Sequence, residues 1–213
     1  QDRHSIVIAG THGKTTTTTM MIETADEVFK DENEKAGYMV GGIPIATGRS
    51  FRLAKGNYFI IEGDEYDTAF FDKVPKFVHY KPQFTILTSV EFDHADIYPD
   101  FEAVKKAFQK LVELIPKNGI LITCAESSDI LSLIQSCKDR TVTYGVSRGD
   151  YQIAEREVIS GRNHFCVKYK NEKIADIAIK AVGEHNALNA LAVFVLAREM
   201  GWPEHSVLQG LAG

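Results

Sequence analysis

A short apolar run, residues 5–9, stops at Gly10 and gives the first indication of the fold class. An uninterrupted run of this kind is typical of a strand that is buried on both faces of a parallel sheet. Three later runs have the same form, and each is bounded by Gly, Pro, Asp or Asn: residues 58–61, 84–87 and 119–123. Strands that alternate with helices predict a parallel α/β sheet.

Helical and alternating segments complete this pattern. Phe101, Val104, Phe108 and Leu111 recur at helical spacing, and a longer helix is expected over residues 184–200. Four alternating segments joined by turns predict a small antiparallel region at about 140–180: residues 141–146, 151–159, 164–169 and 173–179. We therefore expect an α/β fold, a P-loop-type mostly parallel sheet flanked by helices, with a small antiparallel sheet appended.

The composition excludes several classes of partner. The 213 residues include 24 Lys and Arg against 29 Asp and Glu, a net charge of −5, and the basic residues are scattered. This balance argues against a nucleic-acid or anionic-membrane surface, and no apolar run approaches the ~18 residues of a membrane span. The odd set Cys124, Cys137 and Cys166 has no C-x-x-C pair and fits a reducing compartment. We expect a cytoplasmic protein.

A phosphate-binding loop is predicted at residues 10–15, Gly-Thr-His-Gly-Lys-Thr, between the first strand and a helix. Glycines let the backbone fold around an anion, and the N–H groups at a helix N-terminus point at it. Lys14 supplies a positive charge, and the Thr15 hydroxyl can ligate Mg²⁺. The spacing departs from G-x-x-x-x-G-K-[ST] because Ile8 occupies the first glycine position. The alternative is a glycine-rich turn that caps a helix, but strand, loop and helix are in register.

Two acidic segments follow two other predicted strands. Residues 62–67, with four carboxylates, begin where the strand 58–61 ends, and residues 91–96 follow the strand that begins at Phe84. Four neighbouring carboxylates repel one another unless a cation or water screens them. At the carboxyl edge of a parallel sheet, Glu62 is suited to hold a metal that bridges ATP phosphates. His94 can be a metal ligand or a proton shuttle. Each segment taken alone also suits a solvated polar loop.

A fourth segment, residues 183–190, opens the long predicted helix with His185, Asn186 and Asn189. The two asparagines are three residues apart, so they share one helical face. An amide can pair with an adenine edge, and an imidazole can stack on the ring. Polar residues at a helix start also serve as caps, and residue chemistry alone leaves both readings open.

These four segments, in this order, resemble the central ATP-binding domain of the Mur ligase family, ATP-dependent amide ligases that build peptidoglycan precursors. The resemblance covers essentially the whole chain and rests on Gly-Thr-His-Gly-Lys-Thr-Thr, Glu-x-Asp-Glu, Asp-His-x-Asp and Gly-x-His-Asn-x-x-Asn-Ala. It implies ATP and Mg²⁺ as cofactors and a two-step reaction. ATP phosphorylates the lactyl carboxylate of UDP-N-acetylmuramate, and an amine then displaces phosphate to form an amide.

The segment from Glu62 to Ile97 looks most like the branch of the family that joins the tripeptide L-Ala-γ-D-Glu-meso-diaminopimelate in peptidoglycan recycling. The alternatives are the branch that adds L-alanine in de novo synthesis, and a P-loop phosphotransferase or NTPase. The resemblance implies that residues 1–213 are the central domain alone. The nucleotide-sugar domain before it and the amine-acceptor domain after it would be absent, and this segment by itself would be inactive.

The resemblance also implies roles for single residues. Lys14, Glu62 and His94 would be catalytic. Thr15 and Glu62 would hold one Mg²⁺, and His94 would hold a second near the substrate carboxylate. The nucleotide would be bound by Gly10, Thr11, His12, Gly13, Lys14, Thr15, Thr16, His185, Asn186 and Asn189. Two positions depart from the family pattern. Phe108 lies near the place of a carbamylated lysine in several relatives, and Ser89 stands where relatives often have Asn.

Overall fold

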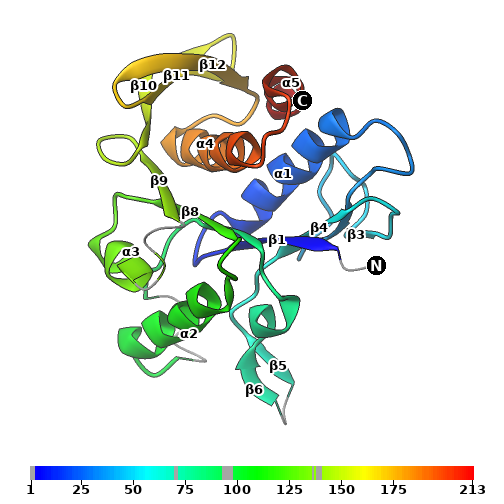
Figure 1. Ribbon diagram of the computed structural model, residues 1–213. Coiled ribbons are helices and arrows are strands. Elements are labelled where there is room, and N and C mark those ends of the chain that lie inside the picture. Colours follow the sequence, from blue (N-terminus) through cyan, green and yellow to red (C-terminus); the bar gives the residue numbers. More distant parts are fainter. Residues whose placement is uncertain (1–2, 70–71, 93–97, 136, 138–140) are drawn as a thin grey trace.

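The computed structural model describes residues 3–69, 72–92, 98–135, 137 and 141–213, and these form a layered α/β fold (Figure 1). The central sheet has ten strands: β1 (His4–Ala9), β2 (Gly37–Met39), β3 (Phe51–Arg52), β4 (Tyr58–Glu62), β7 (Phe84–Leu87), β8 (Ile120–Cys124), β9 (Thr141–Gly145), β10 (Tyr151–Ile159), β11 (Arg162–Tyr169) and β12 (Glu172–Ile179). Their spatial order is β12-β11-β10-β9-β8-β7-β1-β4-β2-β3. A separate antiparallel hairpin consists of β5 (Asp67–Ala69) and β6 (Asp72–Pro75).

The middle of the sheet is parallel, which confirms the expectation from the apolar runs. β1 pairs in parallel with β4 on one side and with β7 on the other, and β8 continues beyond β7. In this register Ile8 lies opposite Glu62 in β4 and opposite Ile86 in β7. The carboxyl ends of β1, β4 and β7 therefore reach the same edge of the sheet.

Helices cover both faces of the sheet. On one face lie α1 (Lys14–Val28), α4 (Glu184–Glu199) and α5 (Glu204–Ala212), and on the other lie α2 (Phe101–Leu114), α3 (Ser128–Leu133) and the 3-10 helix η1 (Lys76–Tyr80) (Figure 1). Residues of β1 alternate between the two cores, because successive side chains of a strand point to opposite faces. Ile6 and Ile8 join the core under α4, whereas Val7 and Ala9 join the core under α2.

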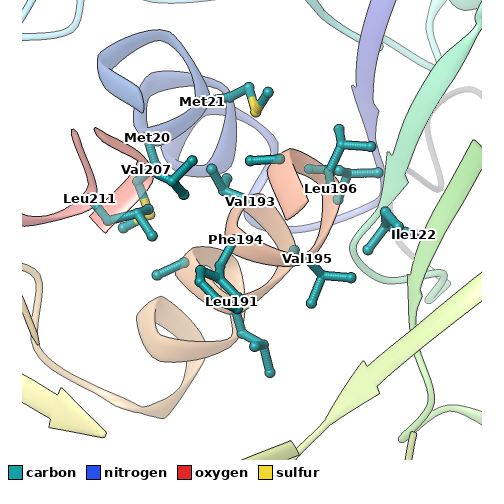
Figure 2. Packing of buried hydrophobic residues seen from close by; sticks show 14 of the residues in the cluster. Met20, Met21, Ile122, Leu191, Val193, Phe194, Val195, Leu196, Val207 and Leu211 are labelled. Atoms are coloured by element: carbon teal, nitrogen blue, oxygen red, sulfur yellow. The ribbon is translucent and has the colours of Figure 1, made fainter. Parts of the chain in front are cut away.

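Helix α4 is the centre of the larger core (Figure 2). It is apolar on nearly every side, and ten of its residues are buried, including an unbroken run from Asn189 to Ala197. Its labelled neighbours in Figure 2 come from three other elements: Met20 and Met21 of α1, Val207 and Leu211 of α5, and Ile122 of β8. A helix with no polar face has to be enclosed on all sides, and α1, α5 and the sheet enclose this one.

One detail of the expected fold needs correction. The segment 141–146 was expected to be antiparallel, but β9 is parallel to β8, because α3 returns the chain to the same end of the sheet before β9 begins. As expected, β11 pairs antiparallel with both β10 and β12, and these three strands are appended to the end of the main sheet. Phe108 is fully buried, which confirms its expected place in the core.

Two further findings concern the sequence expectations. Cys124, Cys137 and Cys166 are free thiols, and all three are buried. Within the described ranges, no helix is both long enough and apolar enough to span a bilayer.

The role of α4 can be tested with two matched leucine truncations. Leu196→Ala in α4 should lower the free energy of unfolding by about 2–5 kcal/mol, because the fully buried side chain leaves a cavity. Leu114→Ala, whose side chain is 40% exposed at the end of α2, should cost less than about 1 kcal/mol. Urea unfolding monitored by circular dichroism gives both values. Equal losses for the two variants would contradict the central position of α4.

Candidate active site

The loop from Gly10 to Gly13 has a backbone that only glycine accommodates well at its two ends. Gly10 has φ 135° and Gly13 has φ 80°, and Gly13 is the left-handed N-cap of α1. A Cβ at Gly10 would lie 2.2 Å from Thr88 Oγ1, and one at Gly13 would lie 2.8 Å from Asn189 Oδ1. A side chain at Gly10 would also meet the Ser89 backbone N at 2.9 Å, whereas at Gly13 the positive φ is the main obstacle to a side chain.

The first part of the loop is fastened to the segment that follows β7. Thr11 N donates to Ser89 O at 3.0 Å, and His12 N donates to Ser89 Oγ at 3.0 Å. Thr88 Oγ1 donates to His12 O at 2.6 Å. Ser89 thus holds the loop directly. The N–H groups of the first turn of α1, from Lys14 to Thr16, have no intrahelical partner, and these remain available to an anion.

Two predicted nucleotide-binding residues of the loop have different surroundings. The His12 side chain lines a cavity beside the loop, and its Nε2 lies 3.6 Å from Glu91 Oε2. Thr11 is buried, and its hydroxyl accepts a hydrogen bond from Glu91 N at 3.2 Å. The structure therefore brings His12 to the cavity, whereas Thr11 ties the loop to the segment after β7.

Glu62 and Thr15 meet at the carboxyl edge although 47 residues separate them in the sequence. Thr15 Oγ1 donates to Glu62 Oε1 at 3.0 Å, and Gly41 N donates to Glu62 Oε2 at 2.9 Å. A hydroxyl and a carboxylate oxygen that converge in this way are the donors that Mg²⁺ prefers. This pair of oxygen donors fits the metal that the sequence resemblance implies.

The repulsion expected among the clustered carboxylates is relieved by separate partners. Asp64 Oδ2 accepts from Lys76 Nζ at 2.7 Å, on the partly exposed side of the segment. Glu65 Oε1 pairs with Lys14 Nζ at 3.0 Å, and these two side chains are only 1% and 15% exposed. The sequence pattern indicates Lys14 but not its pairing with Glu65, because an ion pair across 51 residues leaves no local signal.

His94 lies outside the described residues, as do its neighbours at 93 and 95–97, so its predicted meeting with Glu62 stays a prediction. Glu91, which lies shortly before residue 93 and is described, does contact the phosphate loop, because its backbone N donates to Thr11 Oγ1. Across the described ranges, no group of three or more His, Cys, Asp or Glu side chains is arranged to hold a metal.

A cavity of about 570 Å³ opens beside the phosphate loop, between the start of α4 and the ends of β7, β8 and β9. Its lining includes His12, Gly13, Ser89, Glu91, Cys124, Glu126, Tyr144, His185, Leu188 and Asn189. His185 and Asn189 thus face one cavity. Asn186 does not line it, and its Nδ2 donates instead to Val182 O at 2.8 Å, the local contact of a residue that secures the helix start.

Glu126 forms part of the cavity wall and was not expected from the sequence. Its carboxylate accepts hydrogen bonds from Val146 N at 2.7 Å, Ser147 N at 2.7 Å and Ser147 Oγ at 2.9 Å. Partial burial alone would raise the pKa of Glu126, but the hydrogen bonds from Ser147 and Val146 outweigh burial and lower this pKa below its ordinary value of 4.5. Glu126 is therefore an ionised carboxylate that holds the loop after β9 in place.

The lowered pKa has a consequence for stability as a function of pH. The stabilisation from Glu126 is present above the unfolded-state pKa of 4.5 and is lost as pH falls through the lower folded-state value. Glu126→Gln should therefore lower Tm at pH 7, and its difference from the parent should shrink as the pH falls toward 3. Thermal unfolding from pH 3 to 7 measures this. Glu113→Gln, on the exposed side of α2, should follow the parent throughout, and a constant Glu126→Gln deficit would contradict the assignment.

Comparison with known proteins gives one consistent result. Residues 8–197 match the family described as the Mur ligase middle domain. The chain is 40% identical over 202 residues to a Haemophilus influenzae protein named UDP-N-acetylmuramate–L-alanyl-gamma-D-glutamyl-meso-2,6-diaminoheptandioate ligase. It is 33% identical over 211 residues to the UDP-N-acetylmuramate–L-alanine ligase of Chlorobium phaeobacteroides. These matches cover 94% and 99% of this chain but 43% of either relative, so the chain spans less than half their length.

Solved structures agree with the sequence relatives. The UDP-N-acetylmuramate:L-alanyl-gamma-D-glutamyl-meso-diaminopimelate ligase from Neisseria meningitides superposes with a TM-score of 0.87 at 32% identity, over 99% of this chain and 66% of that one. The UDP-N-acetylmuramate-alanine ligase from Thermotoga maritima gives a TM-score of 0.80 at 25% identity, over 98% of this chain and 44% of that one.

Proposed function

The chain belongs to the Mur ligase middle-domain family, and from this premise we propose that it is the ATP-binding part of a peptidoglycan ligase. The reaction proposed is the ATP-dependent joining of UDP-N-acetylmuramate to L-Ala-γ-D-Glu-meso-diaminopimelate. The observation that carries the proposal is the contact of Thr15 with Glu62 at the mouth of the phosphate loop, at 3.0 Å. A hydroxyl and a carboxylate beside a helix N-terminus are what a magnesium nucleotide needs.

In this proposal different residues of the site bind different parts of the nucleotide. The N–H groups from Gly13 to Thr16 and the Lys14 ammonium bind the phosphates, and His185 and Asn189 bind the adenine in the cavity of about 570 Å³. Thr15 and Glu62 would hold one Mg²⁺ and His94 would hold a second, and these ions would supply positive charge to the phosphate oxygens and the substrate carboxylate. Asn186 contributes by securing the start of α4.

The proposed reaction requires mainly that the reacting groups be positioned correctly. A lactyl carboxylate oxygen attacks the γ-phosphorus, the bond to the bridging oxygen breaks, and ADP leaves. The amine of the peptide then attacks the acyl carbon, loses a proton and expels inorganic phosphate. Such transfers depend on alignment and charge neutralisation more than on covalent help from the protein. Residues 1–213 are proposed to act as one central domain, with the sugar nucleotide and the amine bound by parts of the protein beyond this segment.

Two alternatives are less well supported. A ligase that adds L-alanine is favoured by the 33% identical relative, but the tripeptide ligase from H. influenzae is 40% identical. A P-loop phosphotransferase or NTPase would use the same loop without making an amide. The match of the family over residues 8–197 supports the ligase against this third candidate.

Product analysis on the full-length protein tests the proposal. With ATP, Mg²⁺ and UDP-N-acetylmuramate, the tripeptide should yield an amide product faster than L-alanine does. The segment 1–213 alone should bind Mg²⁺-ADP in calorimetry but form almost no amide. ATP hydrolysis without amide formation by the full-length protein would favour the phosphotransferase, and faster use of L-alanine would favour the other ligase.

Substitutions in the full-length protein assign the roles. His94→Ala should lower kcat by about 100-fold or more and change ATP affinity little, because this residue is proposed to serve the transition state. Glu62→Ala should lower both kcat and the affinity for ATP. His205→Ala, on the exposed start of α5, is the matched histidine control and should behave as the parent.

A further inference from the structure

The Lys14 ammonium has all three of its donors occupied within the protein. It donates to Gly10 O at 2.6 Å, to Thr11 O at 3.4 Å and to Glu65 Oε1 at 3.0 Å. An ammonium group has three N–H donors and no acceptor. A phosphate that binds to Lys14 therefore competes with contacts that already exist.

The contact with Glu65 is also a charge pair in a poorly screened place. The side chains of Glu65 and Lys14 are 1% and 15% exposed, so solvent and salt weaken their interaction little. Two neighbouring carboxylates are directed elsewhere, since Glu62 bonds to Thr15 and Gly41, and Asp64 bonds to Lys76. Glu65 is thus the carboxylate that cancels the charge of Lys14.

The backbone around Glu65 is anchored, which holds the carboxylate in place. Tyr98 Oη donates to Glu65 O at 2.6 Å, and Gly63 N donates to Ile8 O at 2.6 Å. Phe77 N also donates to Asp64 O at 3.3 Å. Because β1 and η1 hold the two residues before Glu65, and Tyr98 holds Glu65 itself, the fold fixes the position of this carboxylate.

We infer that Glu65 is a positioning residue: it holds the Lys14 ammonium over the phosphate loop and, by cancelling its charge, limits the affinity of the loop for nucleotide phosphates. The inference rests on the proposed function, and it deepens that function by naming what sets the balance between binding and release. Without the carboxylate of Glu65, the charge of Lys14 would bind ADP more tightly, and ADP has to be released after every turnover.

ADP binding in calorimetry, measured with EDTA so that no metal takes part, tests this inference. Glu65→Gln keeps a hydrogen-bond acceptor for Lys14 but removes the negative charge, and it should bind ADP about tenfold more tightly than the parent. Glu65→Asp keeps the charge and should stay near the parent. Asp64→Asn removes a charge from the neighbouring, partly exposed carboxylate and should change the affinity less than about twofold.

A second variant covers the case in which Glu65→Gln does not fold, as judged by thermal unfolding. The double variant Lys14→Met/Glu65→Met replaces the buried pair by apolar side chains, a change that proteins often tolerate. Compared with Lys14→Met alone, which leaves the Glu65 carboxylate without its ammonium partner, the double variant should bind ADP about tenfold more tightly, because it no longer carries the charge that opposes phosphate. Equal affinity of these two variants would overturn the inference.

The outcomes separate the two proposals. A tighter Glu65→Gln variant supports the inference, since damage to the fold does not produce a gain in affinity. Parental or weaker binding by this variant overturns the inference while leaving the proposed function intact, and so does an equal gain in Asp64→Asn. Failure of the parent to bind ADP even with Mg²⁺ present would overturn the proposed function together with the inference.

Discussion

The parallel pairing of β1 with β4 and β7 determines where every other part of the site lies. Its register sets Ile8 opposite Glu62 and Ala9 opposite Leu87, so the three strands end together at one edge of the sheet (Figure 1). The chain leaves β1 directly into the phosphate loop, leaves β4 into the acidic segment, and leaves β7 into the segment that holds the loop through Ser89. Burial of β1 on both faces is what keeps this edge in place.

At that edge Glu62, Asp64 and Glu65 each have hydrogen-bond donors of their own. Glu62 is bonded by Thr15 and Gly41, Asp64 by Lys76, and Glu65 by Lys14. A cluster of carboxylates is stable under these conditions because each has a donor of its own. The arrangement leaves the N–H groups at the start of α1 as the uncommitted donors of the loop, which is where the proposed phosphate site lies.

The elements with a strong periodic pattern could be predicted from the sequence, and the contacts between distant side chains could not. The run 5–9 indicates β1, and the apolar spacing of Phe101, Val104 and Phe108 indicates α2, because burial on a given face requires those periods. Spacing alone predicts Asn186 and Asn189 on one face of α4. It could not show that only Asn189 lines the cavity, because the close approach of Asn189 to Gly13 depends on how α4 packs against the loop. The Glu65–Lys14 ion pair joins residues that are 51 positions apart, and the hydrogen bond from Val146 to Glu126 in the cavity wall spans 20 positions, so neither leaves a local pattern in the sequence.

One nucleotide is proposed to bridge the phosphate loop, Glu62 and the cavity at the start of α4. A crystal structure with Mg²⁺-ADP tests this binding mode. We expect the β-phosphate on the N–H groups from Gly13 to Thr16, Mg²⁺ in contact with Thr15 Oγ1 and Glu62, and adenine between His185 and Asn189. ADP bound instead in the groove of about 610 Å³ lined by Thr19, Ile45 and Leu211 would contradict it.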